Sequence, residues 1–447
     1  MALKITVIGT GYLGATHAAA MAELGFEVLG LDVVPEKIEM LAAGKVPMYE
    51  PGLEELLRLH VAGIEGSSGR LRFTTSYEEA GEFGDVHFMC VNTPQKHGEY
   101  ACDMSYVDTA FASLAPHLKH PALVVGKSTV PVGSAERLAR LLTARAPAGQ
   151  DVELAWNPEF LREGFAVDDT LHPDRIVVGV GSEHAEKLLR EVYATPIGEG
   201  SPFVVTDFPT AELVKTAANS FLATKISFIN AMAEVCEAAG GDVVKLAEAI
   251  GYDERIGKKF LRAGIGFGGG CLPKDIRAFM ARAGELGADQ ALTFLREVDS
   301  INMRRRGHMV ELAREAVGGT SFLGKRVAVL GATFKPDSDD VRDSPALNVA
   351  GQIHLQGGQV TVYDPKGTDN ARRLFPTLGY ADTALEAVRG ADVVLHLTEW
   401  REFRELDPAE LKEAVASAII LDGRNALDAG AWRDAGWTYR AMGRPRA

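Results

Sequence analysis

The segment KITVIGTGYLG, residues 4–14, decides the fold of the first part of this chain. A short apolar run is followed by a turn containing Gly9, Gly11 and Gly14, and then by a helical pattern. These glycines permit a tight turn and let a ligand approach the backbone at the start of the helix. The next apolar run ends at Asp32, whose carboxylate can accept hydrogen bonds from ribose hydroxyls and repels a 2′-phosphate. The pattern therefore predicts a dinucleotide-binding turn that prefers NAD to NADP.

Further apolar runs alternate with helical segments along the chain, first up to about residue 200 and again from about residue 323. This rhythm is typical of parallel sheets covered by helices. We predict an α/β fold with two Rossmann-like, doubly wound parallel-sheet domains joined by a long central helix. The expected domains are an NAD-binding domain (1–205), a central helical dimerisation domain with a cysteine loop (206–320) and a carboxy-terminal α/β domain (321–447). The expected strands are 4–8, 27–31, 86–91, 123–126, 152–156, 176–180, 326–331, 359–363, 392–397 and 418–421.

One apolar helical pattern runs from about residue 210 to 239 and ends at two glycines. At 1.5 Å per residue such a helix spans about 45 Å. A single helix of this length cannot bury itself, so we expect it to connect two domains and to offer a face for dimerisation. Asp242 is placed to cap the shorter helix that follows.

The second informative segment is GIGFGGGCLPKD, residues 264–275, in which a glycine run presents Cys271 at an expected helix start. Pro273 suits the first helical turn. The positive helix end and the charge of Lys274 favour the thiolate form of Cys271, which is the form that attacks carbonyl carbons. Asp275 lies one helical turn further on and can reach the same reacting centre. From the residues alone, an inert buried cysteine remains the alternative.

Composition describes a globular protein of enzyme size, with 447 residues, 46% hydrophobic residues and 24% charged residues. The net charge of -14 argues against a nucleic-acid partner, and the basic run at residues 304–306 fits a solvated helix face. The 4 cysteines have no metal-ligand spacing, so we expect no metal and a reducing compartment. Because the first residues lack a signal-peptide pattern and no long apolar run follows, we expect a cytoplasmic location without a membrane partner.

The chain resembles the UDP-glucose/GDP-mannose dehydrogenase family over nearly its whole length. The resemblance rests on the glycine turn and the cysteine loop, and on three further elements in the order found in the family. These are STVPVG at residues 128–133, NPEFLREG at residues 157–164 and FKPDSDDVRDSP at residues 334–345. Together with the cysteine, they imply that a nucleotide sugar is oxidised twice at C6 without release of the aldehyde, with two NAD reduced per sugar. The motifs look most like those of the UDP-glucose branch.

The resemblance implies that Cys271 forms a thiohemiacetal and then a thioester with the sugar. Lys215 and Asn219, spaced i and i+4, lie on one helix face and would stabilise an oxyanion. Glu159 would take part in thioester hydrolysis, and Asp275 would orient or activate water. The full catalytic set is Cys271, Lys215, Asn219, Asp275, Glu159 and Thr129.

Family position also implies two sets of binding residues. Among them, Arg255 is expected to reach the substrate of a neighbouring subunit in a homodimer, and Lys335 supplies a cation for the diphosphate. Arg424 matches a late basic position near cofactor or substrate, for which a structural ion pair is an equal alternative. The expected cofactor set is Gly9, Gly11, Tyr12, Leu13, Gly14, Asp32, Lys37, Thr93, Thr129, Glu163, Lys274 and Arg342. The expected substrate set is Phe160, Leu161, Arg162, Glu163, Lys215, Asn219, Arg255, Phe260, Phe267, Gly268 and Lys335.

Several alternatives remain open at this stage. GDP-mannose and UDP-N-acetylmannosamine dehydrogenases share the domains and the cysteine. A two-electron hydroxyacid dehydrogenase shares the nucleotide domain, the helix and the lysine, but gives no reason for Cys271. A non-catalytic NAD-binding protein is a remote possibility, because the chain carries Lys215, Asn219, Cys271 and Asp275 together. Cys90, Cys102 and Cys236 are expected to be structural, and His17 and His87 to serve in packing or at the surface.

Overall fold

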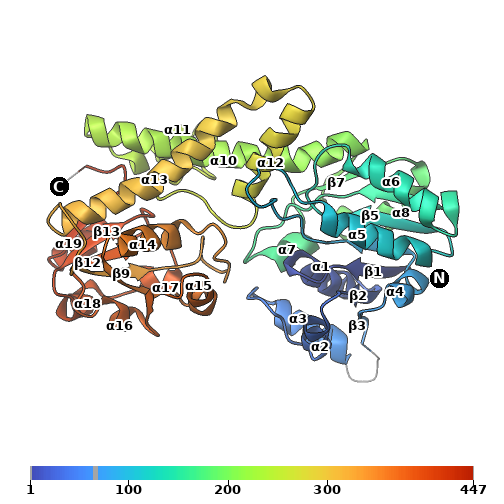
Figure 1. Cartoon of the computed structure of the whole chain (residues 1–447), viewed down its shortest axis with the longest axis horizontal. Helices are drawn as coiled ribbons and strands as arrows, with labels where there is room; N and C mark the ends of the chain where they lie inside the picture. Colours follow the sequence, from blue (N-terminus) through green and yellow to red (C-terminus); the bar gives the residue numbers. More distant parts are fainter. Residues whose placement is uncertain (1–2, 64–68, 446–447) are drawn as a thin grey trace. The chain divides into compact units, whose positions relative to one another are not determined.

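The computed structural model describes residues 3–63 and 69–445, which form two compact units (Figure 1). Among these residues, the first unit contains those up to Ala218 together with Arg277–Leu286, and the second contains Asn219–Ile276 together with those from Gly287 onward. The long helix α10 (Phe208–Ala239) passes from the first unit into the second. None of the described helices combines the length and apolar character needed to cross a bilayer.

Within its described residues, the first unit holds an eight-stranded sheet in the order β3-β2-β1-β4-β5-β6-β7-β8. Neighbouring strands pair in parallel except β6 and β7, which run antiparallel. The predicted fold class, two parallel-sheet α/β domains joined by a long helix, is confirmed, and the β6–β7 pair departs from the parallel arrangement. The strands are β1 (Lys4–Ile8), β2 (Glu27–Leu31), β3 (Leu71–Thr74), β4 (Val86–Met89), β5 (Ala122–Gly126), β6 (Val152–Trp156), β7 (Ile176–Val180) and β8 (Phe203–Thr206).

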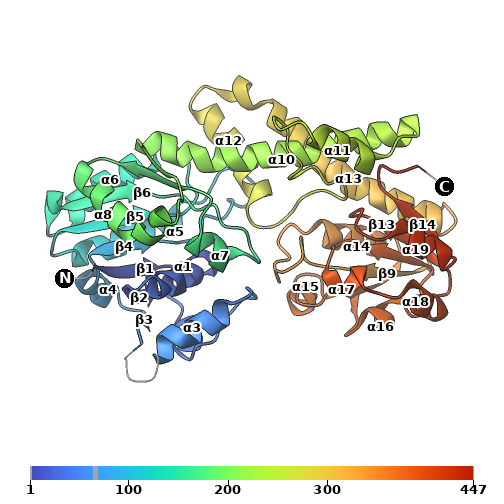
Figure 2. The same cartoon turned by 180° about the vertical axis from the view of Figure 1, so that it is seen from behind.

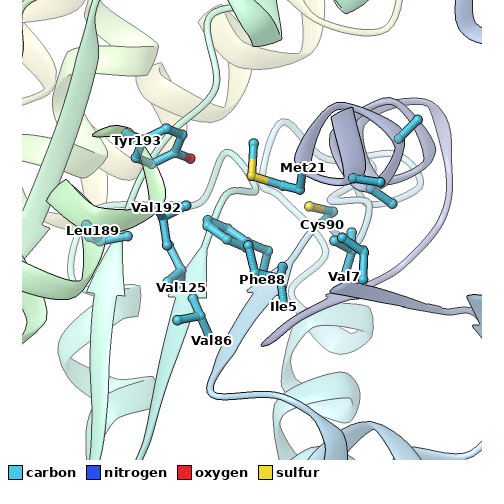
Figure 3. Close-up of a cluster of buried hydrophobic side chains, with 14 of the residues drawn as sticks. Ile5, Val7, Met21, Val86, Phe88, Cys90, Val125, Leu189, Val192 and Tyr193 are labelled. Carbon is cyan, nitrogen blue, oxygen red and sulfur yellow. The ribbon is translucent and has the colours of Figure 1, made fainter. Parts of the chain in front are cut away.

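Helices cover both faces of this sheet, because alternate strand residues point to opposite sides. Ile5, Val7 and Phe88 pack with α1, α3 and α8 on one face (Figure 3), while Ile8 and Met89 pack with α4, α5 and α6 on the other. The helices are α1 (Tyr12–Glu23), α2 (Pro35–Ala42), α3 (Leu53–Ala62), α4 (Tyr77–Phe83), α5 (Ser105–Leu114), α6 (Ser134–Arg145), α7 (Ala166–Leu171), α8 (Glu183–Val192) and α9 (Ala194–Gly198), with 3-10 turns at Ala115–His117 and Gly149–Asp151.

The second unit again consists of a sheet with helices packed on it (Figure 2). Its six strands lie in the order β11-β10-β9-β12-β13-β14 and are parallel throughout the described residues. Its strands are β9 (Arg326–Leu330), β10 (Gln359–Tyr363), β11 (Gly379–Tyr380), β12 (Val393–His396), β13 (Ile419–Asp422) and β14 (Thr438–Ala441). The helices packed on them are α14 (Pro345–Leu355), α15 (Thr368–Leu374), α16 (Ala384–Val388), α17 (Arg401–Arg404), α18 (Pro408–Ala414) and α19 (Ala429–Asp434).

The middle of the chain is helical, as predicted. Besides α10 it contains α11 (Val243–Gly251), α12 (Leu272–Glu285), a 3-10 turn (Asp289–Leu292) and α13 (Phe294–Ala316). The Asp242 side chain accepts hydrogen bonds from the N–H groups of Val244 and Lys245, so the predicted cap of α11 is present. The strands at 71–74, 203–206, 379–380 and 438–441 lie outside the predicted set, because each is short or half-exposed.

A buried carboxylate, Asp422, holds the turn that follows β13. It accepts hydrogen bonds from the Tyr439 hydroxyl, from three backbone N–H groups after β13 and from His396 at 2.9 Å. Burial alone raises the pKa of a carboxyl, but His396 and the N–H donors outweigh it and lower the pKa of Asp422 to about 2. Its stabilising effect is thus complete above the ordinary carboxyl pKa and is lost as the pH falls toward 2.

We predict that Asp422→Asn destabilises the second unit by about 2–4 kcal/mol at pH 7, because an amide cannot accept all these hydrogen bonds. Calorimetry measures this as a lower Tm, and the loss shrinks between about pH 4 and pH 2 as the wild-type carboxylate is protonated. The exposed Asp434→Asn is the control and should leave Tm unchanged. Equal Tm values for Asp422→Asn and wild type at pH 7 contradict the prediction.

Candidate functional site

The glycine turn lies between β1 and α1, where the sequence places it. Gly9 has a φ of 89°, and a Cβ on Gly14 would lie 1.9 Å from the Gly9 carbonyl oxygen, so both positions require glycine. At Gly11, which precedes the first residue of α1, a Cβ would have no neighbour closer than 3.9 Å. Because Gly11 brings no side-chain cap, the first N–H groups of α1 are available to a pyrophosphate.

Asp32 directly follows β2 and faces this turn. Its carboxylate accepts hydrogen bonds from the Thr10 N–H at 3.0 Å and from the Lys37 ammonium at 2.7 Å. The structure thus brings the predicted cofactor residues Asp32 and Lys37 into contact. On the neighbouring strand ends, the Thr93 hydroxyl donates to the Thr129 carbonyl at 2.8 Å. Part of the expected cofactor set, Gly9, Gly11, Gly14, Asp32, Thr93 and Thr129, therefore lies at the carboxyl ends of β1, β2, β4 and β5, whereas Glu163 follows β6, and Lys274 and Arg342 belong to the second unit.

Glu50 joins the glycine turn to the segment 157–164, a connection that the sequence did not indicate. This buried carboxylate accepts hydrogen bonds from the Tyr12 hydroxyl and from the N–H groups of Gly164 and Ala166, the last two at 2.6 and 2.7 Å. Burial and then the bond to Glu50 raise the pKa of Tyr12, so its phenol stays protonated. These hydrogen bonds to Glu50 fix the start of α1, which contains Tyr12, against the segment that contains Glu163.

The segment after β6 carries a buried ion pair. Glu159 Oε1 lies 2.9 Å from Lys215 Nζ on α10, with side-chain exposures of 13% and 5% respectively. The other oxygen, Oε2, accepts a hydrogen bond from the Leu161 N–H at 2.8 Å. Lys215 Nζ also lies 5.7 Å from the centre of the Phe160 ring. Two predicted residues, Glu159 and Phe160, therefore lie beside the predicted lysine, and Leu161 holds the glutamate.

Arg162 in the same segment is exposed and makes a two-pronged contact with Asp169. The predicted residue Leu13 lines a small cavity together with Glu159, Phe160 and Leu161. Leu13 therefore lies near residues 159–161, in addition to packing against the core of the first unit.

Cys271 is exposed and stands immediately before α12, as predicted, whereas the three other cysteines are buried. The Asp275 N–H donates to the Cys271 carbonyl at 2.9 Å in the first turn of the helix. The Asp275 carboxylate is buried, accepts a hydrogen bond from Asn219 Nδ2 at 2.6 Å and lies 3.0 Å from the Lys274 ammonium. Asn219 stands one helical turn after Lys215 on α10.

The glycine loop before Cys271 is held by α13. Asn302 accepts from the Phe267 N–H at 2.7 Å and donates to the Phe267 carbonyl at 3.0 Å. Arg306 donates to the same carbonyl at 3.1 Å and to Asp343 at 2.7 Å, while Arg305 donates to the Gly264 carbonyl at 3.3 Å. The prediction of a solvated basic face is therefore wrong for Arg305 and Arg306, which are 0% and 1% exposed.

The helical register explains this error. Val298, Asn302, Arg305 and Met309 recur at spacings of four, three and four residues, so the arginines lie on the buried face of α13. There they satisfy backbone carbonyls of an irregular loop that has no secondary-structure partner.

The segment 334–345 packs on the other side of the cysteine loop. Gly269 donates to the Arg342 carbonyl at 2.9 Å, and a Cβ on Gly270 would lie 2.3 Å from the Arg342 guanidinium carbon. The predicted residues Phe267 and Gly268 are buried here, and a Cβ on Gly268 would lie 2.3 Å from the Asp343 carbonyl oxygen. Lys335 lies 5.6 Å from the centre of the Phe334 ring.

Arg424 is tied into the protein by three backbone carbonyls. It donates to Leu397, Gly266 and Phe334 and lies 3.5 Å from Glu399. This arrangement favours the structural alternative for Arg424, because its donors already bind backbone carbonyls, one of them in the cysteine loop. Arg255 and Phe260 lie on the segment between α11 and that loop and are exposed; Arg255 pairs with Asp253, and Phe260 has a φ of 64°.

A glycine turn at a helix start, with an acidic strand end facing it, defines a dinucleotide-binding α/β protein. The chain belongs to the UDP-glucose/GDP-mannose dehydrogenase family. The family's NAD binding domain matches residues 3–197, its central domain residues 209–304 and its UDP binding domain residues 328–429.

Individual relatives match almost the entire chain. A UDP-glucose 6-dehydrogenase of Rhizobium meliloti is 42% identical over 99% of this chain and 100% of its own length. A solved UDP-glucose dehydrogenase of Pyrobaculum islandicum has a TM-score of 0.90 and 36% identity, covering 99% of this chain and 98% of that one. A UDP-D-ManNAc dehydrogenase of Pyrococcus horikoshii has a TM-score of 0.86 and 28% identity, with both chains fully covered.

We predict that Asn302→Ala loosens the cysteine loop. The variant removes the hydrogen-bond acceptor of the buried Phe267 N–H, which costs about 1–3 kcal/mol. Calorimetry should show a lower Tm, and the Cys271 thiol should react several-fold faster with a thiol reagent, because the loop that presents it is less ordered. Arg304→Ala, on the exposed face of the same helix, is the control. Wild-type Tm and wild-type thiol reactivity in Asn302→Ala are the outcome against this assignment.

Proposed function

We propose that this chain catalyses the NAD-dependent oxidation of UDP-glucose at C6 to UDP-glucuronate, with two NAD reduced per sugar. The observation that carries the proposal is the exposed Cys271 at the start of α12, next to the buried Asp275–Asn219 pair. A dehydrogenase that stops at the aldehyde needs no nucleophile, whereas oxidation to the acid gains from a covalent thioester. The relatives named UDP-glucose dehydrogenase support the choice of sugar.

The residues of the first unit fit NAD. The N-terminus of α1 offers its N–H groups to the pyrophosphate, and Gly9 and Gly14 occupy positions that a side chain would obstruct. Asp32 is placed to accept hydrogen bonds from the ribose hydroxyls, which would replace part of its contact with Lys37. NAD, when bound, accepts one hydride in each of the two oxidation steps.

Cys271 is the proposed nucleophile. Its sulfur bonds to the C6 carbon of the aldehyde and gives a thiohemiacetal, which the second oxidation converts to a thioester. Lys215 and Asn219 are proposed to stabilise the oxyanion that develops at the C6 oxygen, by an ammonium and by an amide N–H. The Asp275 carboxylate orients the Asn219 amide, to which it is hydrogen-bonded.

Hydrolysis of the thioester releases the carboxylate and restores the Cys271 thiol. We assign Glu159 to this step as the group that takes a proton from water, and Lys215 fixes one of its oxygens at 2.9 Å. Asp275 and Thr129 are proposed to order the attacking water. The expected cofactor and substrate sets of the sequence remain the proposed binding residues, within an NAD-binding domain (1–205), a central domain (206–320) and a UDP-sugar domain (321–447).

A homodimer is proposed from α10. Three of its large apolar side chains are exposed at intervals of seven residues and so share one face of the helix: Phe221, Phe228 and Val235. An exposed apolar stripe of this kind gains from burial against a second copy. We also propose that Arg255 serves the neighbouring subunit's substrate and that the enzyme works in the cytoplasm, where its free cysteines stay reduced.

GDP-mannose and UDP-N-acetylmannosamine are the alternative substrates. The higher identity to the UDP-glucose relatives than to the UDP-D-ManNAc dehydrogenase favours UDP-glucose. A non-catalytic NAD-binding role is disfavoured by the exposed cysteine and the buried Glu159–Lys215 pair.

We predict two NADH per UDP-glucose consumed, because the alcohol loses four electrons on its way to the carboxylate. The measurement is NADH absorbance with limiting sugar, run in parallel with GDP-mannose and UDP-N-acetylmannosamine. Cys271→Ser should turn over at least about 100-fold more slowly, because a serine hydroxyl is a far weaker nucleophile than a thiolate. Cys102→Ser, in which a hydroxyl can donate to the same Thr93 carbonyl, is the control. A ratio of one for the wild type rules out the four-electron reaction.

A further inference from the structure

A buried ammonium lies beside the proposed catalytic glutamate and has no place in the reaction described above. Lys127 directly follows β5 and is 7% exposed. Its Nζ donates hydrogen bonds to Asn157 Oδ1 at 2.9 Å and to the Tyr193 hydroxyl at 3.3 Å. The Tyr193 hydroxyl in turn donates to Asn157 Oδ1 at 2.6 Å. Asn157 stands two residues before Glu159 in the segment that follows β6.

Two effects of the surroundings act on the charge of Lys127 in opposite directions: burial disfavours it, whereas the faces of two aromatic rings attract it. Its Nζ lies 5.7 Å from the centre of the Phe88 ring and 5.9 Å from that of Tyr193. Phe88 and Tyr193 belong, with Cys90, to the apolar cluster drawn in Figure 3. Burial lowers the pKa of Lys127 to about 8. An apolar side chain of similar length would fill this site without the cost of desolvating an ammonium, so packing alone does not explain a lysine here.

The charges that face Lys127 come from several elements. Electrostatic interactions connect it with Glu159, Lys215 on α10, Cys90 after β4 and His17 on α1. Cys90 and then Glu159 oppose the effect of burial on the pKa of Lys127, and Glu159 is the carboxylate among these groups. Lys127 and Lys215 therefore place two ammonium groups around one carboxylate.

A cavity of about 50 Å³ lies between these groups. It is lined by Lys127, Asn157, Glu159 and His17, among others, and both ring nitrogens of His17 are buried without a hydrogen-bond partner in the described residues. The polar side chains among the residues that line it, together with this volume, are sufficient for a water molecule. Glu159 and Lys127 thus face one polar space in the first unit.

We propose that Lys127 is a positioning residue for thioester hydrolysis, which holds the Glu159 carboxylate in place through the attraction of its ammonium and through its hydrogen bond to Asn157. The inference rests on the proposed function. In the step concerned, the water oxygen bonds to the thioester carbon, the carbon–sulfur bond breaks, and sulfur leaves as the thiolate of Cys271. Glu159 takes one proton of the water. The transfer requires the carboxylate oxygen to lie within hydrogen-bond reach of that water, so a group that fixes its position assists the step.

The test compares Lys127→Met and Lys127→Gln in the full-length enzyme with UDP-glucose and NAD. Both variants remove the charge, but glutamine keeps a donor for Asn157. We expect kcat to fall about tenfold or more in both, which is the scale of a lost contribution to proton transfer, with KM for UDP-glucose within about twofold. Mass spectrometry of the enzyme during turnover should show the sugar acyl group accumulating on Cys271, because hydrolysis is the step that slows. The Tm of Lys127→Met should equal or exceed that of wild type.

Lys119→Met, which changes an exposed lysine paired with Glu82, is the matched control and should turn over normally. Recovery of wild-type hydrolysis in Lys127→Gln would mean that the lysine only holds Asn157, and would overturn the charge role. The absence of an accumulating acyl-enzyme in both variants overturns it as well. Failure of the proposed function is distinguished by the wild-type enzyme, which would then not produce two NADH per UDP-glucose.

Discussion

The site of the first unit depends on one constraint, the parallel pairing of β1, β4, β5 and β6, which brings their carboxyl ends to one edge of the sheet. The loop after each strand carries residues of the proposed site. The glycine turn follows β1, Thr93 follows β4, Lys127 and Thr129 follow β5, and Asn157 and Glu159 follow β6. Hydrogen bonds then join neighbouring strand ends, from Thr93 to the Thr129 carbonyl and from Lys127 to Asn157. Because the loops begin on a rigid edge, a few such bonds suffice to fix groups that are far apart in sequence.

The cysteine loop of the second unit is held differently, because it belongs to no strand or helix. Its backbone groups have to find partners in side chains, and Asn302, Arg305 and Arg306 of α13 supply them. Arg424 adds a further donor to the Gly266 carbonyl. The same close packing requires glycine at two loop positions. A Cβ on Gly266 would lie 2.3 Å from Asn302, and a Cβ on Gly270 would lie 2.3 Å from Arg342. Close packing around the loop therefore fixes the position from which Cys271 is presented.

Features that depend only on consecutive residues could be predicted from the sequence. The strand–turn–helix at residues 4–14, the long helix to Ala239, the Asp242 cap and the start of α12 after Cys271 are all local patterns. Glu50, Asn302 and Lys127 escaped prediction because their roles depend on partners 30 or more residues away in the sequence. The antiparallel β7 escaped for a similar reason, since an apolar run gives no strand direction. Arg305 and Arg306 had a readable signal in their helical register, which outweighs the usual meaning of a basic run.

The two units also show why similar folds differ in what they bind. After the second strand of each sheet stands an aspartate, Asp32 or Asp364, that accepts a hydrogen bond from a turn threonine N–H at 3.0 Å. In the first unit Asp32 is also paired with the half-buried ammonium of Lys37, on a flexible side chain that can move away from the aspartate when a ribose binds. In the second unit the buried indole of Trp400 donates to Asp364 at 3.0 Å. The aspartate at this turn is therefore paired with a mobile lysine in one unit and with a buried tryptophan in the other, so a shared strand order does not imply a shared ligand.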